Sequence, residues 1–222
     1  MRESGILMHI SSLPGPYGIG SMGKPAFEFV DFLEKAGQRC WQILPLNPTG
    51  YGDSPYQSCS AYAGNHYLID LDSLVDDGLL EQSELDSVTW CQKDTSVDFG
   101  IQYSNRLNVL RKAFKRHGET EAFARFRAAN DSWLPIYVAY MGLKDKYGSK
   151  PWYQWPEDVK RFSPHAIDAA WAYLGYDGVQ FYCFVQFLFF RQWEALRSYA
   201  HGKNVRIIGV REEALLGEIL ED

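Results

Sequence analysis

The sequence predicts an α/β protein built on parallel strands, with a mostly helical segment inserted between them. Two observations lead to this prediction. An apolar run, a helical pattern and a second apolar run follow one another in residues 5–46, which is the pattern of a βα unit. A further apolar run, Val205–Gly209, appears only after the largely helical stretch 74–200, so the third predicted strand is far from the second in sequence.

The first part of the chain is predicted to form a strand, a helix and a strand. The apolar run Gly5–Ile10 predicts the first strand, and the stretch rich in proline and glycine after it ends that strand. A helix is expected from about Pro25, because the fixed φ of proline suits a first helical turn, and Gly37 stands where a C-terminal cap is expected. Cys40–Leu46 predicts a buried second strand, parallel to the first.

Beyond a polar loop, Gly50–Asn65, the middle of the chain is predicted to be helical. His66–Asp72 predicts a short extended segment, and Asn105–Arg116 predicts a helix with Leu107, Leu110 and Phe114 on its inner face. The other expected features are a helical stretch Thr120–Tyr147 interrupted at Pro135, a turn-rich connector Gly148–Pro156, a helix from Ser163 that Tyr176–Gly178 breaks, and the most apolar helix, Val179–Ala200.

This pattern divides the chain into four expected segments. The first βα units occupy 1–73, with the polar loop inside them, and a helical insertion occupies 74–178. A helix and the third strand follow over 179–209, and a charged tail occupies 210–222.

Composition excludes several classes of function. The net charge of −6 gives no electrostatic footprint for nucleic acid. The longest apolar run, Val179–Phe190, is too short to span a bilayer, and the N-terminus has no signal peptide pattern. The four cysteines form no Cys-x-x-Cys pair, and Cys40 and Cys183 are expected to be buried free thiols. We therefore expect a reduced, cytoplasmic protein without a metal ion.

The loop Gly50–Asn65 is the richest candidate for a binding site. It contains three Tyr and three Gly among Ser, Asp, Gln and Asn, and it follows the predicted second strand. Flat aromatic faces beside hydroxyl and amide groups suit a sugar ring, and such loops often carry function. The alternative is an Ω-loop packed by its own tyrosines.

Residues 18–23, Gly-Ile-Gly-Ser-Met-Gly, match the Gly-x-Gly-x-x-Gly fingerprint of dinucleotide-binding proteins. Three details argue against that function. The turn after the first strand is long and contains two prolines, and Pro25 removes an N–H from the helix start that would face the phosphates. The second predicted strand ends in Leu46-Asn47-Pro48-Thr49, without an acidic residue for a ribose hydroxyl.

Three stretches give the chain a family resemblance: 11–20 (Ser-Ser-Leu-Pro-Gly-Pro-Tyr-Gly-Ile-Gly), 41–65, which starts Trp-Gln-Ile-Leu-Pro-Leu-Asn-Pro-Thr-Gly, and 68–71 (Leu-Ile-Asp-Leu). With 186–193 and 206–209, they resemble the N-terminal half of 4-α-glucanotransferases, also called amylomaltases or disproportionating enzymes. The resemblance implies the first three or so strands of a (β/α)₈ barrel with helical insertions. It also implies retaining, cofactor-free transfer of α-1,4-glucan segments between maltodextrins, in glycogen, starch or maltose metabolism.

The resemblance assigns substrate-binding roles within the polar loop. Ser54 and Tyr56 fall on active-site positions of the family, and Tyr56 is expected to stack beside the scissile bond. Asp53 and Gln57 are expected to brace the loop or bond sugar hydroxyls, and Tyr51 to stack on a more remote glucosyl unit. Loop packing is the alternative role for each of these side chains.

No catalytic carboxylate is assigned in this chain. The resemblance places the nucleophile and the acid/base on later barrel strands. It ends at Gly209, where a charged tail begins, as a frameshift, a truncated gene or a fragmentary gene model would produce. Asp70 and Asp72 are expected to cap or brace a strand end. We therefore expect the chain alone to be inactive, and either to be poorly soluble or to need a second copy or the missing half. A non-catalytic glucan-binding module and a non-functional fragment are the alternatives.

Overall fold

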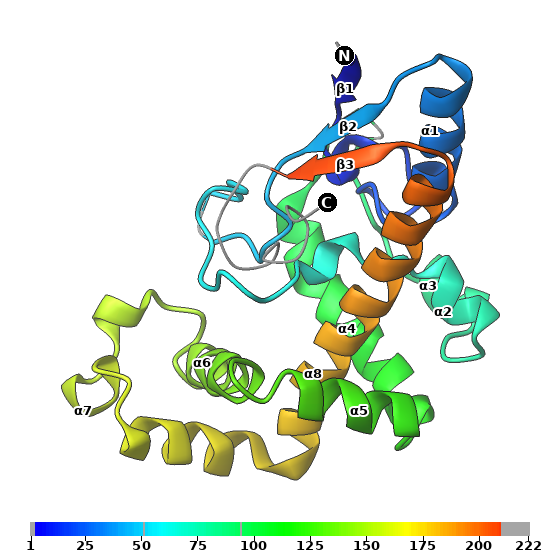
Figure 1. Ribbon diagram of the computed structural model, residues 1–222. Coiled ribbons are helices and arrows are strands. Elements are labelled where there is room, and N and C mark those ends of the chain that lie inside the picture. The colour runs from blue at the N-terminus through cyan, green and yellow to red at the C-terminus, as the bar shows by residue number, and fades with distance from the viewer. Residues whose placement is uncertain (1–2, 51, 94, 210–222) are drawn as a thin grey trace. The chain divides into compact units, whose positions relative to one another are not determined.

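The computed structural model describes residues 3–50, 52–93 and 95–209, and it is an α/β structure (Figure 1). Two compact units are present: Met1–Gly118 with Leu188–Asp222, and Glu119–Phe187. The strands are β1 (Gly5–Leu7), β2 (Cys40–Ile43) and β3 (Arg206–Gly209). The first unit also contains η1 (Ile10–Ser12), α1 (Lys24–Lys35), η2 (His66–Leu68), α2 (Asp72–Asp76), α3 (Gln82–Asp86), α4 (Phe99–His117) and the last part of α8 (Pro164–Gly202).

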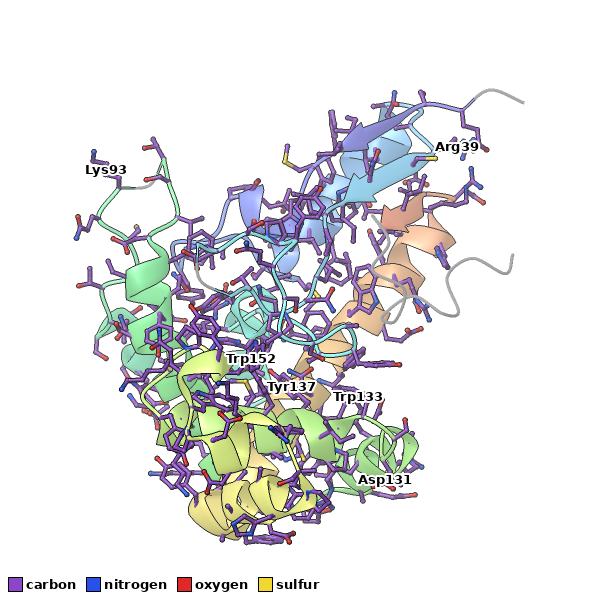
Figure 2. All side chains as sticks on the ribbon, turned by 90° about the vertical axis from the view of Figure 1, so that its left-hand side faces the viewer. Arg39, Lys93, Asp131, Trp133, Tyr137 and Trp152 are labelled. Carbon is purple, nitrogen blue, oxygen red and sulfur yellow. The ribbon has the colours of Figure 1, made fainter. Side chains whose placement is uncertain are left out.

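The strands form one parallel sheet in the order β1-β2-β3, as predicted. Ile6 pairs with Trp41, and Trp41 pairs with Ile207. The carbonyl of Arg39, labelled in Figure 2, accepts a hydrogen bond from the N–H of Arg206 at 2.9 Å just before the ladder begins. The third strand therefore joins the second although more than 160 residues separate them in sequence.

The strands are shorter than predicted. β1 ends at Leu7, because the chain turns into η1 at Ile10, and β2 ends at Ile43, two residues before Pro45, which has no N–H for a ladder. Cys40 is only partly buried, contrary to the prediction, because alternate residues of β2 face a less covered side of the sheet. Cys183 is buried as predicted.

Helix α1 has the predicted start and stop. Pro25 lies in its first turn. Gly37 adopts a left-handed φ of 70°, its N–H bonds the carbonyl of Glu34 at 3.0 Å, and the N–H of Gln38 bonds the carbonyl of Leu33 at 2.9 Å. This pair of bonds is the Schellman motif, which explains the glycine.

Helix α1 and the end of α8 lie side by side next to the sheet (Figure 1). The ring centroids of Phe27 and Tyr199 are 5.0 Å apart, and the Tyr199 hydroxyl donates to Asp31 at 2.7 Å. The Phe29 ring packs edge-on against Trp41 of β2 at 5.0 Å, so the helix covers one face of the sheet.

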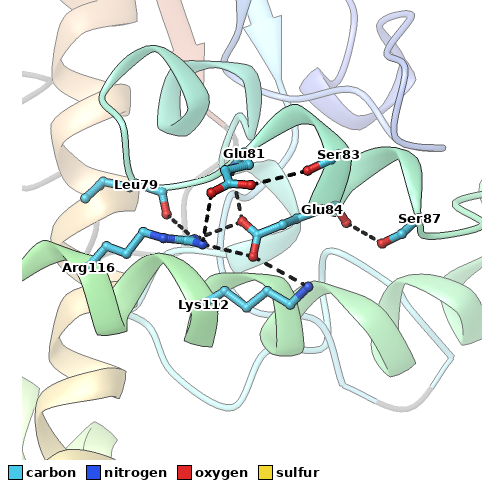
Figure 3. Close-up of polar contacts among 7 residues, drawn as sticks. All are labelled: Leu79, Glu81, Ser83, Glu84, Ser87, Lys112 and Arg116. Atoms are coloured by element: carbon cyan, nitrogen blue, oxygen red, sulfur yellow. Dashed lines mark hydrogen bonds and ion pairs between the residues drawn. The ribbon is translucent and has the colours of Figure 1, made fainter.

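An ion-pair cluster holds α3 against α4 (Figure 3). Arg116 donates to both carboxylate oxygens of Glu84, at 2.8 and 3.1 Å, and to the carbonyl of Leu79 at 3.1 Å. Glu84 also closes a capping box with Glu81 at the start of α3. The hydrogen bond from Arg116 holds the pKa of the Glu84 carboxyl below its usual value.

The second unit is helical and contains its own core. Its elements are α5 (Glu121–Ala129), α6 (Leu134–Lys146), η3 (Trp152–Gln154), α7 (Glu157–Lys160) and the first part of α8. Thr120 caps α5, because its side chain accepts a hydrogen bond from the N–H of Phe123. Pro135 lies in the first turn of α6, so the helical stretch is interrupted there, as predicted. One core cluster comprises Ala139, Leu143, Trp155, Val159, Ala166 and Ala170.

Three predictions about this middle region need correction. His66–Asp72 is not extended: it contains η2 and the first residue of α2. Helix α8 breaks at Gly175, whose φ is 63°, and Tyr176–Gly178 are helical. On α4, only Leu110 of the three predicted core residues is buried, and Gln102 and Arg106 share that buried face. Within the described residues, no helix is both long and apolar enough to cross a membrane.

Candidate functional site

The polar loop after β2 is closed at its base by backbone pairing. The N–H of Gly50 donates to the carbonyl of Gln57 at 2.8 Å, and Thr49 and Ser58 form an isolated antiparallel bridge. These contacts confine the tip of the loop, and a further bond from the N–H of Gln57 to the carbonyl of Ser54 at 3.1 Å makes a turn around Tyr56. The tip is therefore a short, pinned structure, although it contains no regular element.

Ser54 and Tyr56 are coupled within that turn. The Oγ of Ser54 accepts a hydrogen bond from the N–H of Tyr56 at 3.3 Å, as in an ST-turn. The Tyr56 side chain is 54% exposed, so its ring is available to a ligand, whereas its backbone is held. Ser54 thus orients the aromatic residue that the sequence singles out.

Asp53 has an uncommon backbone conformation within the turn. Its φ of 55° is in the left-handed region, which non-glycine residues seldom adopt. Burial raises the pKa of its carboxyl above the usual value. Burial, followed by the charge of Asp53, raises the pKa of Tyr67 to about 12. Tyr67 of η2 is therefore within electrostatic reach of the loop carboxylate.

Gln57 and Tyr51 complete the predicted set. Gln57 is exposed and contributes to the loop through its backbone, since its N–H and its carbonyl close the two bonds described above. Tyr51 lies outside the described residues. The structure therefore brings Asp53, Ser54, Tyr56 and Gln57 together on one turn.

The second half of the loop is held by Asn47, a buried residue just after β2. Its Nδ2 donates to the carbonyls of Ser60 at 3.0 Å and Ala63 at 3.4 Å. Gly64 follows at a close approach to α8, because a Cβ there would lie 2.0 Å from Cδ1 of Phe189. Only glycine fits between this part of the loop and that ring.

Asp70 is a buried hydrogen-bonding centre just after η2. Its carboxylate accepts from the hydroxyl of Ser21 at 2.8 Å and from the N–H and hydroxyl of Ser73 at 2.9 and 2.6 Å. Its backbone N–H and carbonyl are both bonded by Gln192 of α8. A Cβ at Gly23 would lie 2.0 Å from this carboxylate, so one glycine of the Gly-x-Gly-x-x-Gly match makes room for Asp70.

Asp70 caps and braces a segment, as predicted, but that segment is the first turn of α2 and not a strand end. Asp72 accepts a hydrogen bond from the hydroxyl of Tyr17. Burial and then this bond raise the pKa of Tyr17 to about 12. Both carboxylates are thus engaged in holding backbone and loops together.

Two buried polar residues of α4, which no sequence pattern above singles out, join segments that are distant in sequence. Arg106, with 1% of its area exposed, donates from Nη2 to the carbonyls of Tyr67 at 2.7 Å and Ile69 at 2.5 Å. Gln102 donates to the carbonyls of Tyr17 at 2.7 Å and Trp90 at 3.2 Å. Burial lowers the pKa of Arg106 to about 10. Their i, i+4 spacing on an otherwise buried face is the signal that could have identified them.

His9 lies just after β1 and is mostly buried. Its Nδ1 is enclosed without a hydrogen-bond partner among the residues that the structure describes. Burial lowers its pKa from 6.5 to about 4, so the imidazole is neutral at pH 7. No group of three or more His, Cys, Asp or Glu side chains in residues 3–50, 52–93 and 95–209 has an arrangement suited to a metal ion.

Comparison with known proteins gives one consistent result. A family model described as 4-alpha-glucanotransferase matches residues 8–212. The chain is 45% identical over 212 residues to the 4-alpha-glucanotransferase of Streptococcus pneumoniae, and 44% identical over 214 residues to that of Thermus thermophilus. In each case the match covers 94% of this chain and 42% of the relative.

The fold agrees with a solved structure from the same group. The amylomaltase from Streptococcus agalactiae in complex with acarbose superimposes with a TM-score of 0.88 at 35% identity, over 97% of this chain and 45% of that chain. The chain thus spans less than half the length of the proteins that it matches.

Proposed function

The chain belongs to the 4-alpha-glucanotransferase family, and we propose that its loop 50–65 is part of the α-1,4-glucan-binding site of such a transferase. The observation that supports this proposal is the pinned turn carrying Tyr56. The turn presents an exposed aromatic face on a held backbone, with a serine and a carboxylate beside it. Such a surface suits a glucosyl ring, whose C–H face stacks on an aromatic ring while its hydroxyls bond polar groups.

In this proposal the loop positions the substrate. Tyr56 stacks on a glucosyl unit beside the scissile bond, and Ser54 and Asp53 bond its hydroxyls. Gln57 lines the same turn, and Tyr51, outside the described residues, stacks on a more remote unit. The family resemblance supports these roles, and the acarbose complex of the similar amylomaltase is consistent with a glucan-like ligand.

We also propose that β1, β2 and β3 are the first strands of a (β/α)₈ barrel. Their parallel order supports this, and so does the position of the loop after the carboxyl end of β2, where barrel enzymes place their sites. Segments 1–73 and 179–209 then form barrel, 74–178 is an insertion, and 210–222 lies outside the described residues.

The reaction proposed is retaining transfer of an α-1,4-glucan segment. It requires a carboxylate nucleophile and a carboxylic acid/base about 5 Å apart. We assign neither role to Asp53, Asp70 or Asp72, the acidic residues in or nearest the loop. The resemblance places both catalytic roles on later barrel strands, and Asp70 and Asp72 are already bonded to serines or to a tyrosine. Positioning of the sugar is therefore the function that we propose for this chain.

The test is a titration of the 222-residue chain with maltotriose and maltoheptaose, followed by tryptophan fluorescence, with cellohexaose as the matched β-linked control. We expect saturable binding of the maltodextrins and none of the cellohexaose. Equal binding of the two linkages, or no binding by folded chain, would overturn the proposal. Conversion of maltotriose to maltopentaose and glucose would require a nucleophile within this chain, which contradicts the positioning role.

A further inference from the structure

The helical unit carries two exposed aromatic side chains in one short turn. Trp152 and Tyr153 belong to η3, and 53% and 58% of their areas are exposed; Trp152 is labelled in Figure 2. Single exposed apolar residues are ordinary, but adjacent exposed aromatic residues in a held turn are a common feature of binding surfaces.

The turn is held firmly by its neighbours. The N–H of Gln154 donates to the carbonyl of Pro151 at 2.9 Å, and the N–H of Trp155 donates to the carbonyl of Trp152 at 3.1 Å. Trp155 is buried, and its Nε1 donates to the carbonyl of Lys150 at 3.0 Å. The rings that pack on Trp155 are Tyr140 and Tyr147, with centroids 5.4 and 6.0 Å away. The backbone that presents the two exposed rings is thus ordered before any ligand arrives, which lowers the entropic cost of binding.

The two exposed rings form a corner. The centroids of Trp152 and Tyr153 are 6.2 Å apart, and their planes meet at 81°. A pyranose ring fits such a corner, because its C–H face can stack on one ring while its edge contacts the other. The side chains of Lys150, Gln154 and Asp158 are exposed nearby in sequence and can bond hydroxyl groups.

The surroundings favour a neutral, polyhydroxylated ligand over other occupants. Exposed charges of both signs flank the turn, and Glu157 is paired with Lys160 at 3.3 Å. Because neither sign of charge dominates, the turn does not favour an anionic or a cationic ligand. A protein partner or a membrane would need a continuous apolar patch of several hundred Å², whereas the exposed polar residues Lys150 and Gln154 stand close on either side of these two rings in sequence.

We propose that Trp152 and Tyr153 form a second contact site for α-1,4-glucan, distinct in sequence from loop 50–65, which is called the Tyr56 loop below. This inference rests on the proposed function, since it takes the glucan from the chain's family. A polymeric glucan has many equivalent glucosyl units, so units beyond those held by the Tyr56 loop are free for a second platform. The expected consequence is stronger retention of long glucans than of short ones.

The experiment measures retention in native gels that contain soluble amylose, with the 222-residue chain and single variants. We expect Trp152→Ala and Tyr153→Ala each to weaken the apparent amylose affinity about three- to tenfold, because one aromatic stacking contact contributes on that scale. Trp152→Phe should keep most of the affinity. The matched control is Trp171→Ala, which removes another exposed tryptophan of the same unit and should leave retention unchanged.

Maltotriose binding distinguishes the two sites. Trp152→Ala should leave maltotriose affinity within about twofold of the parent chain, whereas Tyr56→Ala should lower it. Amylose should also protect the parent chain, but not Trp152→Ala, from part of the quenching of tryptophan fluorescence by acrylamide. If amylose retention is unaffected by Trp152→Ala while Tyr56→Ala lowers it, the second site is wrong and the proposed function stands. If folded parent chain binds neither ligand, both fail.

Discussion

Two hydrogen bonds join the backbone of Asp70 to the side chain of Gln192, 122 residues away in sequence. The N–H of Asp70 donates to Oε1 of Gln192 at 2.7 Å, and Nε2 of Gln192 donates to the carbonyl of Asp70 at 3.0 Å. One amide side chain of α8 thus satisfies both backbone groups of a buried residue just after η2. It joins the N-terminal part of the chain to the helix that leads into β3.

Gln192→Leu is expected to destabilise the fold by about 2–4 kcal/mol, because it leaves two buried backbone groups without partners. The measurement is the midpoint of urea unfolding. Gln38→Leu is the control, since Gln38 makes one exposed side-chain bond, and it should change stability by less than ~0.5 kcal/mol. A midpoint for Gln192→Leu equal to that of the control would contradict this prediction.

Tyr56→Ala is expected to weaken maltoheptaose binding about three- to tenfold while leaving the melting temperature unchanged. The ring is more than half exposed, so its loss removes a stacking face and little packing. Calorimetric titration and a thermal scan measure the two effects. Tyr62→Ala removes another exposed tyrosine of the same loop and should have a smaller effect on affinity. Equal losses for the two variants would argue against a specific role for Tyr56.

Gly64→Ala is expected to cost about 1–3 kcal/mol, because its Cβ would overlap the ring of Phe189 and force the loop or the helix to move. Gly202→Ala is the control: its Cβ would meet nothing within 4 Å, so stability should be unchanged or slightly higher. The double variant Gly64→Ala/Phe189→Leu should lose less stability than the sum of the losses in the two single variants. Strict additivity of the two changes would show that they do not share this contact.

His9 is expected to make the fold sensitive to acid. Its pKa is about 4 in the folded protein and 6.5 ordinarily, so between these values the unfolded chain binds a proton that the folded chain does not. Stability is therefore lost as the pH falls from 6.5 towards 4, by at most ~3.5 kcal/mol from this group.

The measurement is the difference in unfolding free energy between pH 7 and pH 4.5. His9→Phe should lose less stability on acidification than the parent chain, and the exposed His201→Phe should lose as much as the parent. An unchanged acid response in His9→Phe would show that His9 does not titrate as described.

The sheet is expected to promote self-association of the 222-residue chain. In the described part of the chain β1 and β3 are the outer strands, and Leu7 and Ile208 on them are 57% and 42% exposed. Outer strands with apolar side chains are templates for pairing. Leu7→Lys with Ile208→Lys should lower the apparent mass in size-exclusion chromatography at high concentration. A monodisperse, cooperatively melting monomer of the parent chain would contradict this.

The sequence by itself determined the class of the fold and the position of the candidate site. Helix ends such as Pro25 and Gly37, and the apolar run at β2, are encoded by residues whose preferences act locally, so they could be recognised without the structure. The Tyr56 loop stood out for the same reason: turn residues and aromatic side chains are concentrated in one short stretch.

Only the tertiary structure decided which polar side chains join segments that are distant in sequence. Arg106 and Gln102 look like surface residues in sequence, yet they are buried, because the carbonyl groups that accept their hydrogen bonds come from segments that the fold brings to α4. Gln192 likewise needs Asp70 as its partner. Hydrophobic periodicity records which side chains avoid water on average. It carries no record of a hydrogen-bond partner distant in sequence, and such a partner is what makes burial of a polar group favourable.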